Sequence, residues 1–281
     1  MKNTENYFKQ DGEVWLNDAY LSDPVLAPAR LALVSSLVKE LNPKSLMDVG
    51  CGDGRFLRSL SSVENRFGID YSQSMLSLAS NFGEGIVYKG IDLNSDESFQ
   101  SLKVLGPMDM ITLMGLIHYL EKPLLSLNHL NPCTKVGTTL VVSFRNKLFN
   151  IDPTSKYFNS YLTLKEFSRI EEEKNLWKEC SSKNEGLDKI LMNVKTNRIL
   201  EYISTNQTFE GATDSAWNPN GYENWRQFTP LEATSLLMKA GYKPSQIFPI
   251  GGPTDQMNVM KESQNANVTD CTSFVLVANR I

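Results

Sequence analysis

The chain has 281 residues, of which 41% are hydrophobic, an ordinary proportion for a folded globular protein with a proper core. Its formal net charge of −4 and pI near 5.4 provide no basic surface for a polyanion, so we expect no nucleic-acid partner. No apolar run approaches the roughly 20 residues that span a bilayer. Residues 1–12 lack the apolar core of a signal peptide, so we also expect no membrane partner and a cytoplasmic location.

The cysteines are far apart in the chain, at Cys51, Cys133, Cys180 and Cys271, and none forms a C-x-x-C pair. This spacing predicts neither a zinc site nor a disulfide framework, and no metal is expected. The oligomeric state is not indicated by the sequence.

The first predicted element is a helix that starts at Asp23-Pro24, a typical helix start, and runs to Leu41. Its apolar residues recur every three or four positions, and Asn42-Pro43 ends it. The apolar run Ser45 to Val49 then predicts the first strand.

The stretch from Ser45 to Leu57, S-L-M-D-V-G-C-G-D-G-R-F-L, organises the rest of the chain. Glycines at alternate positions 50, 52 and 54 predict a tight turn that opens a helix over 54–63, where a ligand can approach the bare backbone. A dinucleotide fingerprint would place its third glycine where Arg55 stands. The turn therefore predicts a nucleotide site and disfavours a dinucleotide.

Strands are predicted at 66–69, 85–89, 108–114 and 138–144, and they alternate with helices at 73–80 and 122–130. A helix from Thr229-Pro230 to Ala240 and two strands at 245–250 and 272–278, expected to be antiparallel, complete the chain. This alternation with short connections predicts an α/β fold with a doubly wound parallel sheet.

Residues 146–228 break the alternation and are predicted to be an insertion with helices at 163–178 and 187–202. The segment carries three of the four tryptophans, Trp177, Trp217 and Trp225. So many aromatic residues suggest a lid with its own small cluster over the carboxyl ends of the strands, although each of them could equally pack within the insertion.

With Asp48 two residues before the first glycine, the turn resembles motif I of the class I S-adenosylmethionine (SAM) dependent methyltransferases. Asp70 follows Gly50 by twenty residues, where an acid accepts hydrogen bonds from both ribose hydroxyls. The resemblance covers residues 24–145 and 229–281. It implies a Rossmann-like seven-stranded methyltransferase sheet with an inserted helical lid, in which residues 1–145 and 229–281 form the SAM-binding core and 146–228 the lid.

The resemblance implies SAM as cofactor and assigns it a set of binding residues. Asp92 accepts from the adenine amino group, Leu93 lies against the ring, and Tyr71 and Met75 are adenine walls. The complete set is Asp48, Gly50, Cys51, Gly52, Asp70, Tyr71, Met75, Asp92, Leu93, Met114 and Gly115. Cys51 is expected to be a small filler and not a nucleophile.

The catalytic residues are sought after the fourth strand. Related families have G-V-L-E-H-L-x-D-P there, and this chain has G-L-I-H-Y-L-E-K-P, so that His118 falls one place early and Tyr119 takes the histidine's position. Methyl transfer needs a base only where the acceptor holds a proton, and His118 is the candidate general base. It could equally be a pocket-wall or core histidine. His129 is predicted to lie on a surface helix without a role.

Arg145, at the end of the fifth strand, is a candidate acceptor-binding residue. It could clamp a phosphate or carboxylate together with Tyr222, Trp225 and Arg226, or it could be an ordinary surface arginine.

Phe144 to Asn150 is similar to small-molecule methyltransferases of bacterial surface-polysaccharide pathways. The expected function is methyl transfer to an oxygen or nitrogen of a small molecule, with sugars and phosphorylated metabolites as candidates. The alternatives are a SAM-binding protein without catalysis, a nicotinamide-dependent oxidoreductase, and a protein or RNA methyltransferase.

Overall fold

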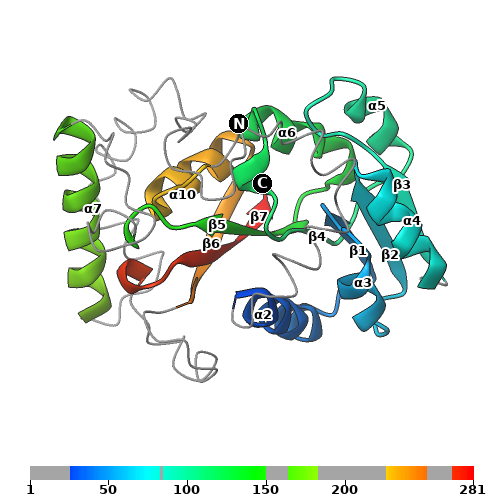
Figure 1. The fold of residues 1–281 in the computed structure, drawn as a ribbon, viewed down its shortest axis with the longest axis horizontal. Helices are drawn as coiled ribbons and strands as arrows, with labels where there is room; N and C mark the ends of the chain where they lie inside the picture. The colour runs from blue at the N-terminus through cyan, green and yellow to red at the C-terminus, as the bar shows by residue number, and fades with distance from the viewer. Residues whose placement is uncertain (1–25, 83–84, 150–163, 183–225, 252–267) are drawn as a thin grey trace.

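The computed structural model describes residues 26–82, 85–149, 164–182, 226–251 and 268–281 (Figure 1). The start of the first predicted helix, the predicted helix at 187–202, Tyr222 and Trp225 lie outside these residues. Within the described part, no helix has the length and apolar character needed to cross a membrane.

A single seven-stranded sheet has the order β3-β2-β1-β4-β5-β7-β6. The first five strands are parallel, and β7 pairs antiparallel with both β5 and β6. The strands are β1 (Ser45–Val49), β2 (Asn65–Asp70), β3 (Ile86–Gly90), β4 (Met110–Leu113), β5 (Thr139–Arg145), β6 (Tyr242–Ile250) and β7 (Ser273–Arg280). This order confirms the doubly wound methyltransferase sheet. It places the switch in strand order between β1 and β4, where such sheets bind their ligands.

Helices cover both faces of the sheet (Figure 1). One hydrophobic cluster joins α2 and α3 to the sheet through residues such as Val34, Leu57 and Met110. The other joins α5, α6 and α10 to the opposite face through Leu102, Leu127 and Leu236. The helices are α2 (Leu26–Leu41), α3 (Arg55–Ser59), α4 (Gln73–Phe82), α5 (Ser98–Lys103), α6 (Pro123–His129), α7 (Leu164–Ser182) and α10 (Pro230–Lys239), with short 3₁₀ turns η2 (Ile117–Tyr119), η3 (Asn131–Cys133) and η5 (Val268–Asp270).

Two predicted elements are shorter in the structure. The helix predicted over 54–63 is reduced to α3, because Gly54 has a φ of 73° and Leu60 leaves the helix with its N–H bonded to the Leu57 carbonyl. The strand predicted over 108–114 is reduced to β4, because the Met108 N–H bonds to the Cys133 carbonyl and Gly115 turns the chain with a φ of 78°. The short helix α5 was not predicted.

Helix α7 is the described helix of the inserted segment, and it packs on the core. Trp177 is 2% exposed and belongs, with Ile170, to the same cluster as Leu236 of α10. The expectation that the insertion's aromatic residues form a separate cluster is therefore wrong for Trp177, whose indole N–H is satisfied by Glu173 at 3.2 Å. A large apolar ring with a bonded N–H can join a shared core.

Two buried glutamates join α7 to the start of α10. Glu232 forms a capping box with Thr229 and also pairs with Arg169 of α7 at 2.6 Å. Glu173 accepts hydrogen bonds from Trp177 and from the Leu231 N–H at 2.9 Å. Burial raises the pKa of Glu173 to about 7, and the nearby Glu232 carboxylate adds to the shift. The docking of α7 therefore depends on a carboxyl group that changes charge near neutral pH.

Glu173→Gln should remove part of the pH dependence of stability. The pKa of Glu173 is raised in the folded protein above its ordinary 4.5. The stabilisation from the protonated side chain is therefore fully present below pH 4.5 and is lost as the pH rises toward 7. The loss amounts to about 2 to 3 kcal/mol, which the glutamine should escape. Urea unfolding at pH 5 and pH 8 measures the difference from wild type. Glu172→Gln, an exposed neighbour on α7, is the control; equal pH dependence in Glu173→Gln and wild type would contradict the prediction.

The third glycine of the turn makes room for a side chain from β3. A Cβ at Gly54 would overlap the hydroxyl of Tyr88, and one at Gly68 would meet the same ring at 2.6 Å. Gly54 also has a φ of 73°, which only glycine adopts without strain. The turn after β1 is thus packed directly on β3 across β2.

Gly54→Ala should destabilise the protein more than Gly137→Ala. Both glycines have positive φ, 73° and 89°, but nothing lies within 4 Å of a Cβ at Gly137. The backbone strain of about 1 to 2 kcal/mol is common to both variants. The overlap with Tyr88 adds about 1 to 3 kcal/mol at Gly54 alone. Chemical unfolding measures both; equal losses would mean that Tyr88 moves aside freely.

Candidate functional site

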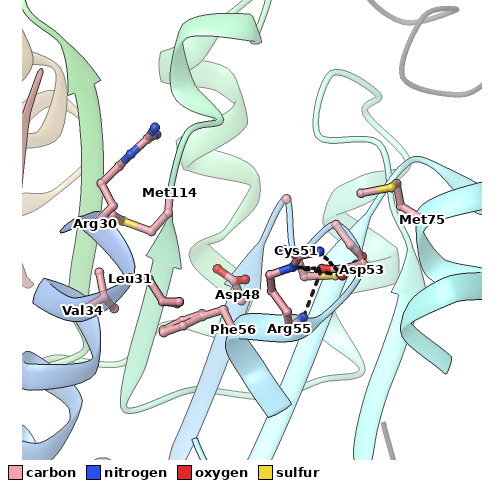
Figure 2. Close-up of a pocket in the computed structure, with 12 residues that line it drawn as sticks. Arg30, Leu31, Val34, Asp48, Cys51, Asp53, Arg55, Phe56, Met75 and Met114 are labelled. Atoms are coloured by element: carbon pink, nitrogen blue, oxygen red, sulfur yellow. Dashed lines mark hydrogen bonds and ion pairs between the residues drawn. The ribbon is translucent and has the colours of Figure 1, made fainter. Parts of the chain in front are cut away.

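A pocket lies at the carboxyl end of β1, between the glycine turn and α2 (Figure 2). It holds about 630 Å³ of space between and beside the lining atoms, a volume that includes open solvent. Its lining residues are Arg30, Leu31, Val34, Asp48, Gly50, Cys51, Gly52, Asp53, Arg55, Phe56, Met75 and Met114.

Half of this lining was predicted from the sequence: Asp48, Gly50, Cys51, Gly52, Met75 and Met114. Asp70, Tyr71, Asp92, Leu93 and Gly115 are not among the described lining residues. The α2 residues were missed, although a signal existed: Arg30 is the only charged residue between Val25 and Val38, on a helix with an otherwise apolar face.

The turn itself is fixed by β2. The backbone N–H groups of Gly50 and Cys51 both donate to the Ile69 carbonyl, at 2.8 and 3.1 Å. Asp70 accepts from the Gly52 N–H on one oxygen and from the Ser72 N–H on the other, both at 2.9 Å. The Tyr71 N–H bonds to the same carboxylate, so three of its roughly four acceptor positions are taken. Burial raises the pKa of Asp70, and the backbone N–H groups oppose the shift.

Asp48 is a second buried acid beneath the turn. It is 5% exposed and accepts a 2.6 Å hydrogen bond from the Thr112 hydroxyl. Burial raises its pKa to about 7; the Asp70 carboxylate adds to this and the Thr112 bond opposes it. Two buried acids favour a ligand that carries positive charge and disfavour the pyrophosphate of a dinucleotide.

Two arginines, Arg55 and Arg30, line the pocket. Arg55 is held by Asp53, with contacts of 2.8 to 3.0 Å. Arg30 extends from α2 toward the end of β4, where a Cβ on Gly115 would lie 3.0 Å from its Nη1 (Figure 2). The pocket therefore has an acid, Asp48, and a cation, Arg30, on separate elements, an arrangement that fits the ammonium and carboxylate of an amino acid end. No group of His, Cys, Asp and Glu that could hold a metal occurs in the described ranges.

His118 lies on η2, directly after β4, and is 3% exposed. Its ring centroid is 4.2 Å from that of Tyr119. Burial lowers the pKa of His118 well below its usual value, and the cations of Arg145 and Arg30 lower it further. The histidine is therefore neutral at pH 7, and the structure brings it within electrostatic reach of both arginines.

His129 was predicted to lie on the surface, and this is wrong. It is 6% exposed, and its Nδ1 is 3.0 Å from the Leu93 carbonyl, so that it joins α6 to the loop after β3. In that loop Leu93 packs in the core and Asp92 accepts from the Asn94 N–H at 2.9 Å. Cys51 is buried with a raised pKa, as expected of a filler.

The predicted anion clamp is only partly described. Arg145 ends β5 and is half-buried, as expected. Arg226 is 4% exposed and donates to the carbonyls of Leu120 at 3.0 Å and Glu121 at 2.5 Å. A guanidinium committed to buried backbone is not a ligand-binding group, so this role is wrong for Arg226.

Comparison with known proteins agrees with the fold and the turn. The family model described as "Methyltransferase domain" matches residues 25–209, about two thirds of the chain. No curated protein matches the chain in sequence.

Solved structures are similar at low sequence identity. Magnesium protoporphyrin IX methyltransferase from Synechocystis PCC 6803 with bound SAH (S-adenosylhomocysteine) has 14% identity and a TM-score of 0.52, over 99% of this chain and 98% of that chain. An S-adenosylmethionine dependent methyltransferase from Mesorhizobium loti has 16% identity and a TM-score of 0.52, over 89% and 100%. An O-methyltransferase family protein from Burkholderia thailandensis has 13% identity and a TM-score of 0.54, over 99% and 63%.

The glycine turn, the buried acids and the strand order thus coincide with a family match over most of the described core. The Synechocystis enzyme is also solved with bound SAM, at a TM-score of 0.52. The chain belongs to the methyltransferase domain family, and it is a methyltransferase whose cofactor is S-adenosylmethionine.

Proposed function

We propose that this protein transfers a methyl group from SAM to an oxygen or nitrogen of a small molecule, with sugars and phosphorylated metabolites as the candidate acceptors. The observation that carries the proposal is His118, a buried histidine directly after β4 with Arg145 and Arg30 in electrostatic reach. A base beside cations suits an acceptor that holds both a proton and a negative charge. Identities of 13 to 16% carry the fold and not the acceptor, so the acceptor rests on this chain's own residues.

The pocket residues have proposed roles toward the cofactor, which when bound supplies a methyl group activated by a sulfonium. Asp70 binds the ribose diol, since its carboxylate lies beside Gly52 of the turn and keeps an acceptor position. Asp48 and Arg30 bind the amino acid end. Tyr71, Met75, Asp92 and Leu93 surround the adenine, and Gly50, Cys51, Gly52, Met114 and Gly115 provide backbone or wall.

Toward the acceptor, His118 takes the proton at its neutral ring nitrogen and Tyr119 lies beside it. The lowered pKa keeps His118 unprotonated at neutral pH, at the expense of base strength. An anionic group beside Arg145 would offset the positive field that lowers this pKa. Binding of a phosphorylated or carboxylated acceptor would therefore strengthen the base.

The domain division is part of the same proposal. Residues 1–145 and 229–281 form the SAM-binding core. Residues 146–228, which include Tyr222 and Trp225, are an inserted segment that covers the acceptor. Support comes from α7, which is docked on the start of α10 through Arg169 and Glu173. Helix α7 therefore has a fixed place on the core.

A second candidate function follows from Tyr119. It occupies the position at which related families have a histidine, which suits a protein that binds SAM and acts as a binding or scaffolding module without catalysis. The two candidates share the cofactor pocket and differ only in transfer.

Asp48 should make cofactor affinity depend on pH. A cationic amino acid end favours the ionised carboxylate, so SAH should bind more tightly at pH 8 than at pH 6, by up to about tenfold for a pKa near 7. Asp48→Asn should bind more weakly and without this dependence. Thr112→Val, which removes the 2.6 Å hydrogen bond, should move the rise in affinity to higher pH. Isothermal titration with SAH measures all three; equal wild-type affinity at pH 6 and pH 8 would contradict the role of Asp48.

Release of SAH from SAM tests the transfer itself. The assay pairs each phosphorylated metabolite in a panel with its dephosphorylated counterpart, and turnover should require the phosphorylated member. Arg145→Gln should lower kcat/KM about 10- to 100-fold, the worth of a charge-assisted hydrogen bond. His118→Gln should lower kcat about 100- to 10,000-fold while SAH affinity is kept.

The control is Lys135→Gln, a 53% exposed cation that pairs with Asp109. It should leave kcat/KM unchanged. Transfer to the dephosphorylated members alone would overturn the anionic acceptor. SAH binding without turnover on any pair would favour the non-catalytic candidate.

A further inference from the structure

Residues 226–228, where the chain leaves the inserted segment, bond both to the end of β5 and to the loop that carries His118. Arg226, Gln227 and Phe228 are all 4% exposed or less. The Phe228 N–H donates to the Arg145 carbonyl at 2.9 Å, and its carbonyl accepts from Lys147 at 3.0 Å. Phe228 thus forms an isolated parallel β-bridge with Asn146, the residue that follows β5.

Arg226, two residues before this β-bridge, contacts the loop that carries His118. The Arg226 N–H donates to the His118 carbonyl at 2.9 Å, and its guanidinium donates to the carbonyls of Leu120 and Glu121. The turn η2 uses the carbonyls of Leu116 and Ile117 for its own bonds. Arg226 thus donates hydrogen bonds to three carbonyls that have no partner within the turn. A buried carbonyl without a donor would be costly.

The choice of arginine is explained by its shape. A planar guanidinium presents donors in a fixed fork, so Nε and Nη2 reach two successive carbonyls at once. An ammonium is a point donor on a flexible stem and cannot hold both in one geometry. The contact therefore specifies the position of the loop more strictly than a single hydrogen bond would.

We propose that Arg226 is a positioning residue for His118: it fixes the loop from Leu116 to Glu121 and ties the end of the inserted segment to that loop. The inference rests on the proposed function only in giving His118 a part in methyl transfer. The positioning itself can be tested without an acceptor.

Histidine ring NMR provides the readout, because the chain has only two histidines. His129, bonded to the Leu93 carbonyl from α6, is the internal reference. Arg226→Gln should broaden or shift the His118 ring signals and move its pKa upward toward about 6.5, since a released loop admits water. Arg145 and Arg30, the cations that face His118, stay in place, so the change reports the loop. His129 signals and SAH affinity should not change.

The matched control is Arg169→Gln, which breaks a different arginine contact between the inserted segment and the core, the 2.6 Å pair with Glu232. It should lower stability and leave the His118 signals as in wild type. Arg226→Lys keeps a cation and should give an intermediate His118 shift; it replaces Arg226→Gln if the latter does not fold.

Two results would overturn the proposal. One is lower stability in Arg226→Gln with His118 signals and pKa as in wild type, which would make Arg226 a structural staple alone. The other is an equal His118 shift in Arg169→Gln, which would mean general loosening. Failure of every acceptor in the transfer assay would refute the proposed function and leave the NMR result standing.

Discussion

The site depends on the hydrogen bonds that tie the glycine turn to β2. Gly50 and Cys51 donate to Ile69, and Gly52 donates to Asp70, so the turn cannot move without β2. The same bonds hold the Asp70 carboxylate against the turn, and Asp48 is buried beneath the turn. Tyr88, packed against Gly54 and Gly68, supports the turn from β3. Strands β1, β2 and β3 therefore fix the glycine turn in place, although α3, the helix that follows the turn, has only five residues.

Charge divides the site into two parts. Near the turn, burial raises the pKa of both Asp48 and Asp70, and the Asp70 carboxylate adds to the rise at Asp48, a cost that a cationic ligand relieves. After β4, burial lowers the pKa of His118, and the cations Arg145 at the end of β5 and Arg30 on α2 lower it further. A cofactor that carries a sulfonium and an acceptor that carries an anion would each enter the part of opposite sign. Such complementarity orients both ligands before any chemistry takes place.

The inserted segment is attached to the core at both ends of its described part. Helix α7 packs at the start of α10 through Arg169, Glu173 and Trp177. At the other end of the segment, Arg226 bonds to the loop that carries His118. Each attachment uses buried polar groups, whose hydrogen bonds specify a position more strongly than apolar packing does. Helix α7 and residues 226–228 are therefore each fixed to the core by polar contacts.

The sequence by itself determined the class of fold, the order of strands and helices, and the glycine turn with its flanking acids, because periodicity and glycine spacing are local properties. It could not determine which residues of α2 face the pocket, that His129 is buried, that Trp177 joins the main core, or that Arg226 bonds to backbone. These depend on which distant segments meet: α2 lies against the turn, the loop after β3 against α6, and residue 226 against residue 118. Only tertiary packing decides the partners of a buried polar group, and with them its charge and its role.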